Sequence, residues 1–276
     1  MSSGLLFFIS VVAGLVGALS GMGGGVVLIP VLTGCGIDIK RAIPVSVISM
    51  IVISNSAASS YVRRHLPNLK VSAFLEIFAV AGSLVGASIT LISGRRLLFF
   101  LCGGIILSSW IMLWRQRKEI WTPDAAQDSF SHALLLEGSY YDYGEKKTIA
   151  YRGRRAYLGG PLMFGAGIIS GLLGIGGSSL TVLIHDVVMG LPPKVSLTTS
   201  NLIIGVMALA GTSIYLEGGL IDPKLVIPVI LGAPLGAWVG SKLLVGFTNR
   251  VAHLIFLSIL IVLGVEMIIH GIMGIQ

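Results

Sequence analysis

Long apolar runs separated by short polar stretches dominate this sequence. Most runs approach or exceed the roughly 20 residues that an α-helix needs to cross a bilayer. Within them the only formally charged residues are Glu76, Lys242 and Glu266. The strand-length alternation that is typical of a membrane β-barrel is absent. The pattern predicts an all-α integral membrane protein with eight hydrophobic segments, at residues 5–35, 42–62, 71–93, 97–114, 156–184, 195–216, 225–247 and 251–272.

The second half of the chain repeats the pattern of the first. The glycine-rich stretch at residues 14–25 aligns with residues 167–178, and a later register aligns Lys40 with Lys194 and Arg96 with Arg250. This predicts a tandem duplication of a four-segment unit. Membrane repeat 1 is residues 1–114, a polar connector is 115–155, and membrane repeat 2 is 156–276. Such repeats are the usual construction of secondary transporters, whose substrate site lies at the repeat interface.

Segments 1 and 5 are each interrupted near the middle by a glycine cluster, at residues 21–25 and 174–177. Each interior glycine costs a helix about 1 kcal/mol relative to alanine, so a cluster favours a break. We therefore expect each segment to be two half-helices with an unwound tip. Re-entrant hairpins would make the two repeats inverted, whereas single bent spans would make them parallel, and the sequence leaves both open.

Composition narrows the class of protein. Only 11% of the residues are charged and the mean hydropathy is +0.93, whereas soluble proteins average about 25% charged residues. This excludes a disordered chain, a nucleic-acid-binding domain and an ordinary soluble enzyme. The net charge of +7 reflects Lys and Arg in the loop at 63–70 and in the connector. Both are therefore expected in the cytoplasm of a multi-pass cell-membrane protein.

The two glycine clusters are candidates for binding an anion. Unwound backbone at membrane depth must be buried in protein or line a cavity, and a half-helix that begins there presents free N–H groups and a positive dipole end. Purely structural unwinding is the alternative. Glycine pairs elsewhere, such as Gly82 with Gly86 and Gly236 with Gly240, are typical of helix packing. The predicted anion site comprises Gly23, Gly24, Gly25, Gly176, Gly177 and Ser178.

Hydroxyl and amide side chains follow each glycine segment. Thr198, Thr199, Ser200 and Asn201 are four consecutive hydrogen-bonding residues, which no single helix face can conceal. The alternative is that these hydroxyls only donate to carbonyls of their own helix and have no role in the pathway. We expect this run to line the substrate pathway, with Ser46 and Ser49 as counterparts in the first repeat.

Two intramembrane carboxylates, Glu76 and Glu266, are candidates for coupling transport to a proton. Both lie near segment ends, where contact with water is the alternative. The sequence contains no catalytic constellation, no metal-ligand spacing and no cofactor-binding motif, so we expect neither an enzyme nor a bound metal or cofactor.

The duplicated blocks Gly-x-x-Ser-Gly-Met-Gly-Gly-Gly and Ser-Gly-Leu-Leu-Gly-Ile-Gly-Gly-Ser, together with the Thr-Ser-Asn of residues 199–201, resemble those of the sulfite exporter TauE/SafE family. The resemblance covers nearly the whole chain. It implies a bundle of seven or eight helices that moves sulfite, sulfonates or related sulfur-containing anions, often outwards. Ser178 departs from the pattern, because family members commonly carry a third glycine there.

These observations together predict a secondary transporter, in the exporting direction, for a small sulfur-containing anion. Its partners would be that anion, the lipid bilayer and a coupling proton, with no nucleic acid and with a homo-oligomer left open. A passive anion channel would use the same lining. A non-transporting membrane anchor or assembly subunit, docked through the connector, is the remaining alternative.

Overall fold

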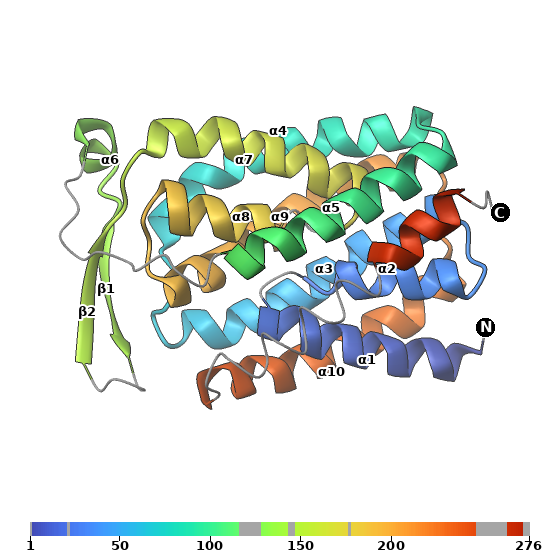
Figure 1. The fold of residues 1–276 in the computed structure, drawn as a ribbon. Helices are drawn as coiled ribbons and strands as arrows, with labels where there is room; N and C mark the ends of the chain where they lie inside the picture. Colours follow the sequence, from blue (N-terminus) through green and yellow to red (C-terminus); the bar gives the residue numbers. More distant parts are fainter. Residues whose placement is uncertain are drawn as a thin grey trace.

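The computed structural model describes residues 2–20, 23–115, 128–142, 147–175, 178–246 and 264–272, and most of it is helical (Figure 1). In chain order the elements are α1 (Ser3–Ser20), α2 (Gly25–Gly34), α3 (Ile39–Val62), α4 (Leu69–Ile92), α5 (Arg95–Arg115), α6 (Ser129–Ala133), β1 (Glu137–Asp142), β2 (Lys147–Arg152), α7 (Ala156–Leu173), α8 (Ser178–Leu183), the π-helical turn η2 (Ile184–Val188), α9 (Pro193–Glu217) and α10 (Pro223–Gly246).

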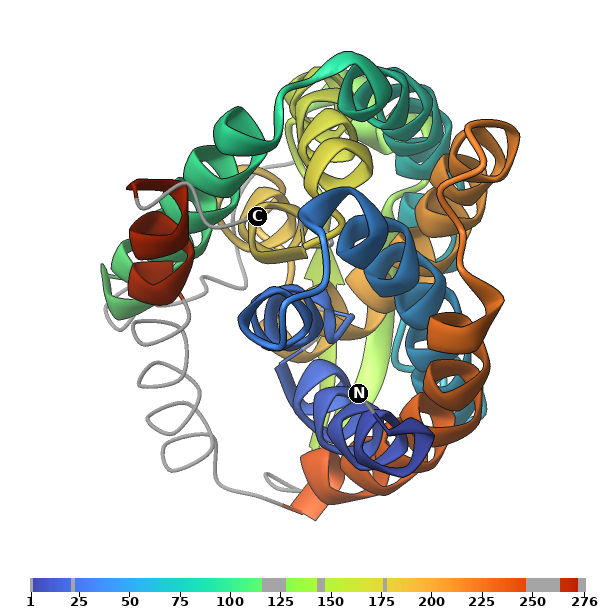
Figure 2. The ribbon, with the colours of Figure 1, turned by 90° about the vertical axis from the view of Figure 1, so that its right-hand side faces the viewer.

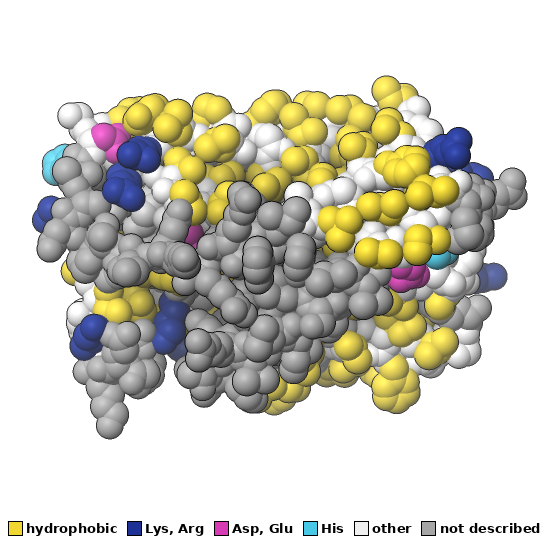
Figure 3. Space-filling model, in the orientation of Figure 1, with side chains coloured by type: hydrophobic (Ala, Val, Ile, Leu, Met, Phe, Trp, Pro, Cys, Tyr) yellow, Lys and Arg dark blue, Asp and Glu magenta, His cyan; other side chains and the backbone are white. Residues whose placement is uncertain are grey.

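Length and composition suit this bundle to a bilayer. Within the described residues, the helices long and apolar enough to span it are α3, α4, α7, α9 and α10, and α1 and α2 are shorter apolar helices. Hydrophobic side chains dominate the described surface between the two ends in Figure 3, and Lys and Arg lie towards those ends. The prediction of an all-α membrane protein is confirmed. We call the end that carries β1 and β2 the connector end and the opposite one the terminal end.

Both glycine clusters interrupt their helices where the sequence predicts. Helix α1 ends at Ser20 before α2 begins at Gly25, and α7 ends at Leu173 before α8 begins at Ser178. Gly23 and Gly24 have φ angles of 69° and 74°. Glycine adopts these left-handed angles without the steric penalty of a Cβ atom, so the cluster makes a turn that other residues would strain.

The chain reverses direction at each interruption. A Cβ atom at Gly17 would overlap the backbone nitrogen of Gly24, and one at Gly24 would lie 2.8 Å from the Ala13 carbonyl oxygen, so α2 folds back on α1. In the second half, the Arg154 N–H donates to the Met189 carbonyl at 3.0 Å, which joins the start of α7 to the end of η2. Both segments are therefore re-entrant hairpins.

The two hairpins enter from opposite ends of the bundle. Helices α3 and α9 run antiparallel, since Gly205 faces Ser54 whereas the later Gly211 faces the earlier Val47. The α1–α2 hairpin opens at the terminal end, beside the N-terminus, and the α7–η2 hairpin opens at the connector end (Figures 1 and 2). The two halves thus have inverted orientations. The bounds of α7 follow those of α1 at an offset of 153, and those of α10 follow α4 at 154.

The predicted glycine packing seams are confirmed. Helix α4 lies against α7, and α10 lies against α1, with glycines facing backbone carbonyls so closely that a Cβ atom would overlap them. Small residues permit this approach where hydrophobic attraction between helices is weak. The contacts pair Gly82 with Phe164, Gly86 with Ile168, Gly236 with Val11 and Gly240 with Leu15.

The connector departs from the all-helical expectation. Its described part contains α6 and the antiparallel pair β1–β2, in register from Glu137 opposite Arg152 to Asp142 opposite Lys147. Tyr140 on β1 and Tyr151 on β2 are buried. Six-residue strands with mixed polarity carry too weak a pattern to predict alone, so the sequence did not indicate this hairpin.

Most of the eighth predicted segment, residues 251–272, lies outside the described residues. Residues 264–272 are helical and lie beside α5 (Figures 1 and 2). The contact again uses a small residue, because a Cβ atom at Gly103 would meet the side chain of Ile268 at 2.7 Å.

Candidate functional site

The tips of the two hairpins meet inside the bundle. A Cβ atom at Gly25 would overlap both the carbonyl oxygen of Gly174 and the hydroxyl of Ser46. A Cβ atom at Gly23 would lie 3.1 Å from Met50 and 3.2 Å from Ile204, which sit near the middle of α3 and α9. The glycines therefore allow backbone from both halves to approach near the middle of the bundle.

Ser46 joins the two halves at this meeting point. Its hydroxyl is fully buried and donates to the Gly174 carbonyl at 2.6 Å. That carbonyl ends α7, where helical partners are missing, so the bond satisfies an acceptor that lipid could not. The predicted residue Ser46 thus lies directly beside both glycine breaks.

Helix α2 begins at the tip without a side-chain cap. Gly24 is its N-cap and provides no side-chain acceptor. The first backbone N–H groups of a helix have no intrahelical partner, and the positive end of the dipole lies there. Gly24 and Gly25 thus place donors at the tip. In the second half, Gly176 and Gly177 lie outside the described residues, and α8 begins at Ser178, whose side chain is also outside them.

Two predicted site residues direct their hydroxyls to their own helices. Ser49 donates to the Ser46 carbonyl at 2.6 Å, and Thr198 donates to the Lys194 carbonyl at 2.8 Å. Bonding of a hydroxyl to a carbonyl of its own helix is the alternative that the sequence left open, and it is common in membrane helices. The hydroxyl protons of Ser49 and Thr198 are therefore used within their own helices, and the two residues are not part of the site proposed below.

The Thr199 side chain is hydrogen-bonded to the loop between α3 and α4. Its hydroxyl accepts from the Asn68 backbone N–H at 3.0 Å, and the Asn68 side chain donates to the Tyr151 hydroxyl at 3.2 Å. Asn68 also caps α4 by accepting from Val71 N–H. Thr199 therefore anchors the connector hairpin to α9, one turn before the middle of the bundle, instead of lining the tips.

Ser200 contacts a histidine that the sequence reasoning missed. Nδ1 of His185 lies 2.9 Å from Ser200 Oγ, both residues are fully buried, and Nε2 of His185 has no hydrogen-bond partner among the described residues. His185 lies in η2, and π-helical turns are frequent at functional sites. The available signal was a lone histidine at the end of an apolar segment, which by itself is weak.

Asn201 occupies the seam between α3 and α9. Its Nδ2 donates to the Leu197 carbonyl at 3.1 Å, and its buried Oδ1 has no partner among the described residues. Gly205, one turn later on the same face, lies against Ser54. The Ser54 hydroxyl is likewise buried and unpaired, so two polar groups on facing helices lack partners near the Gly23 tip.

The two carboxylates predicted for proton coupling lie apart from the tips and from each other. Glu76 is half-buried in the first two turns of α4 and accepts from the Ser72 hydroxyl at 2.8 Å. Glu266 lies beside Gly34, towards the terminal end. Within the described part of the chain, no group of three His, Cys, Asp or Glu residues stands close enough to hold a metal ion.

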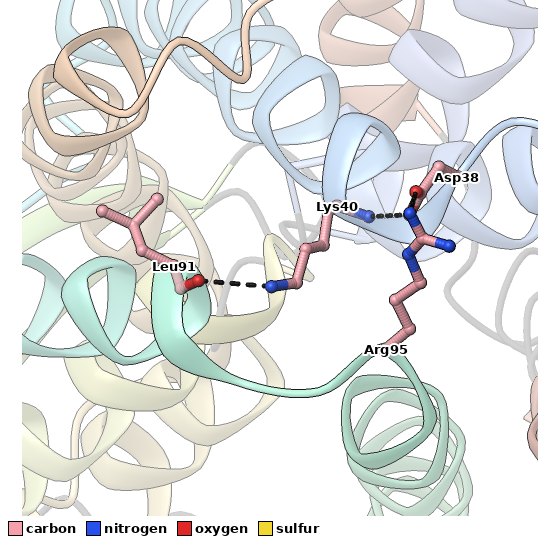
Figure 4. Close-up of polar contacts among 4 residues, drawn as sticks. All are labelled: Asp38, Lys40, Leu91 and Arg95. Atoms are coloured by element: carbon pink, nitrogen blue, oxygen red, sulfur yellow. Dashed lines mark hydrogen bonds and ion pairs between the residues drawn. The ribbon is translucent and has the colours of Figure 1, made fainter.

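Charged side chains join two turns at the terminal end (Figure 4). Arg95 Nη2 lies 2.7 Å from Asp38 Oδ2, and the Lys40 ammonium donates to the Leu91 carbonyl at 3.2 Å. The Arg95 side chain is 57% exposed, and ion pairs in such positions contribute little to stability. These contacts therefore position the α2–α3 turn against the α4–α5 turn more than they stabilise it.

Known proteins resemble this chain over most of its length. The family model described as "Sulfite exporter TauE/SafE" matches residues 6–267. The Probable membrane transporter protein YunE of Bacillus subtilis (strain 168) is 27% identical over 282 residues, which cover 99% of both chains. The Probable membrane transporter protein YdhB of the same organism is 26% identical over 254 residues, which cover 92% of both. No solved structure is significantly similar. By this match the chain belongs to the sulfite exporter TauE/SafE family of membrane transporters.

Proposed function

We propose that the protein is a secondary transporter that exports a small sulfur-containing anion, sulfite or an organosulfonate, across the cell membrane. One observation carries the proposal: two re-entrant hairpins from oppositely oriented halves meet at glycine tips inside the bundle. Broken helices at a repeat interface are where secondary transporters bind substrate. The family description and the names of the two relatives agree with transport.

The binding site that we propose uses neutral donors. The free N–H groups at the start of α2 would face the oxygens of the anion, together with the second tip at residues 176–178. Ser46 would hold the two tips together through its bond to Gly174, and Asn201 would line the site. Sulfite and sulfonates present three acceptor oxygens, which suit converging N–H and O–H donors at a helix N-terminus. No Lys or Arg is needed there, which keeps binding weak enough for release.

The connector end would face the cytoplasm. Arg63 and Arg64 lie in the loop at this end, Lys70 lies in the first turn of α4, and the connector adds further Lys and Arg, as the positive-inside rule predicts for a cytoplasmic side. Transport would then rock the two halves about the tips, with Glu76 and Glu266 as candidates for carrying a coupling proton. The Arg95–Asp38 pair would open when the external side opens.

The test is sulfite flux in proteoliposomes that contain the purified full-length protein. We expect saturable, gradient-coupled flux, which Asn201→Leu abolishes while leaving the protein folded. Thr212→Val is the matched control, because the Thr212 hydroxyl bonds to the Ala208 carbonyl of its own helix, away from the tips. Flux by Asn201→Leu at the level of the unsubstituted protein would refute the assignment of this residue.

Two other outcomes would replace the proposal. Flux that rises linearly with concentration and ignores the gradient would identify a passive anion channel. Complete absence of flux for sulfite and sulfonates, together with a binding partner that is lost when residues 121–148 are deleted, would identify a membrane anchor or assembly subunit.

A further inference from the structure

The unpaired buried polar atoms do not follow the symmetry that relates the two halves. Ser54 and Asn201 hold such atoms on the α3–α9 seam. At the offset that relates α3 to α9, the residue equivalent to Ser54 is Ala208 and the residue equivalent to Asn201 is Val47. The inverted fold therefore places a polar pair, Ser54 and Asn201, at one position of the seam and an apolar pair, Ala208 and Val47, at the symmetry-related position. Packing that both halves share cannot account for a polar pair found on one side only.

The orientation of the Asn201 amide is fixed by its own helix. Nδ2 donates to the Leu197 carbonyl at 3.1 Å, so a flipped amide would place oxygen against oxygen. Oδ1 is consequently the atom that faces away from Leu197. A carboxamide oxygen only accepts hydrogen bonds, so the group that it awaits must be a donor.

Ser54 lies across the seam from this acceptor. Its Cβ is 3.4 Å from the position of a Cβ atom at Gly205, which sits one turn from Asn201 on the same face of α9. One turn earlier on α3, Met50 contacts the Gly23 tip. The unpaired acceptor and the unpaired hydroxyl therefore lie within about one helical turn of the anion-binding N–H groups.

An anion with acceptor oxygens alone leaves Asn201 Oδ1 unsatisfied. Sulfate and simple alkanesulfonates are of this kind at neutral pH. An anion that carries its own O–H or N–H, such as hydrogensulfite or a hydroxy- or aminosulfonate, satisfies the tip donors with its oxygens and Oδ1 with its proton. Leaving a buried polar group unpaired is costly, so the site discriminates between the two kinds.

We propose that Asn201, with Ser54 opposite, is a specificity determinant that selects hydrogen-bond-donating sulfur anions over all-acceptor ones. This rests on the proposed function and deepens it, since it names the class of sulfur anion that the site takes. Asn201 Oδ1 is the group that accepts the hydrogen bond from the substrate, and the tip at Gly23–Gly25 binds the oxyanion.

The matched probes are 2-hydroxyethanesulfonate and ethanesulfonate, which differ by one hydroxyl. Their dissociation constants are measured by thermal stabilisation of the purified full-length protein, since a ligand stabilises the folded state according to its affinity. We expect the hydroxylated probe to bind about ten- to a hundredfold more tightly. Asn201→Val, which copies Val47 of the other half, should remove this preference, and Ser54→Ala should reduce it. Thr212→Val should keep it.

Equal affinity of the unsubstituted protein for both probes would overturn this inference, because water would then satisfy Oδ1. A preference that survives in Asn201→Val would also overturn it and would place the discriminating acceptor elsewhere. Both outcomes leave the proposed function standing, since the probes still bind. Failure of the function itself has a different signature, which is no stabilisation by any sulfur anion and no flux.

Discussion

Gly82 and Gly86 on α4 face carbonyl oxygens of α7, and Gly236 and Gly240 on α10 face carbonyl oxygens of α1 in the same spacing. The tyrosines follow the same rule. Tyr61 donates to the Ala18 carbonyl, and Tyr215 donates to the Gly171 carbonyl. Each pair of contacts is related by the offsets that relate the helices. The backbone packing of the two halves is therefore nearly equivalent.

The polar groups inside the halves are not equivalent. Buried side-chain atoms without partners among the described residues include those of Ser54, Ser170, His185 and Asn201. Their positional counterparts are Ala208, Gly17, Leu32 and Val47, which offer no polar side chain. Equivalent packing lets two inverted halves exchange conformations at similar free energy, whereas a single small substrate needs its polar contacts only once. The difference separates residues that pack the two halves together from the polar residues that we propose recognise the substrate.

The largest expected effect tests the equivalence of the packing. Gly82→Ala and Gly236→Ala each place a methyl group onto a backbone carbonyl that cannot move independently. We expect each to destabilise the folded protein by about 1–3 kcal/mol or more, and by similar amounts. Thermal unfolding in detergent measures both. Gly165→Ala is the control, because nothing lies within 4 Å of a Cβ atom there.

If one of the two substitutions were tolerated as well as Gly165→Ala, the halves would not share their packing.

A smaller effect sharpens the polar difference. Ser54→Ala removes a buried hydroxyl that lacks a partner, so we expect the anion-free protein to gain about 1 kcal/mol of stability. The reciprocal Ala208→Ser adds a hydroxyl in the other half and should give no gain. Unfolding temperatures measured without anion test this pair. A loss of stability in Ser54→Ala would show that Ser54 supports packing and not recognition.

The smallest effect concerns the connector, where Asp128 joins α6 to the start of α7 through partly exposed hydrogen bonds. Burial acts to raise the pKa of Asp128, but hydrogen bonds from Ser131 and from the Arg155 N–H bring it below the ordinary value of 3.8. The contribution of Asp128 is therefore complete above that value and is lost as the pH falls through the lower folded-state pKa. Proteolytic protection of the connector should decrease on such acidification, and Asp128→Asn should lack this dependence. An unchanged pH profile in the variant would exclude Asp128 as the titrating group.

Several features of the fold could be read from residue patterns. The helix interruptions at the two glycine clusters follow from the cost of glycine in helices, and the packing seams follow from the spacing of small residues. Asn68 and Asp38 cap α4 and α3 with side-chain oxygens, which agrees with the helix starts that charge and hydropathy suggested. These are local properties, because each depends on residues within a few positions of one another.

The candidate site was less accessible to such reasoning. Thr198, Thr199, Ser200 and Asn201 form one polar run in the sequence, yet the structure gives them four different partners. His185 went unnoticed, because a single histidine has no periodicity. The β1–β2 hairpin was missed because short strands with mixed polarity lack a distinctive pattern.

Residue patterns alone establish a helical membrane protein with two similar halves, broken helices and a polar connector. Hydropathy, glycine content and charge act on each segment separately, so they can be evaluated one segment at a time. The folded chain adds that the broken segments are re-entrant, that the halves are inverted, and that Ser46 lies between the two tips. Those features depend on contacts between residues more than a hundred positions apart, such as Ser46 and Gly174. Which of many chemically similar hydroxyls and amides remains unpaired is set by the space that other helices leave around it.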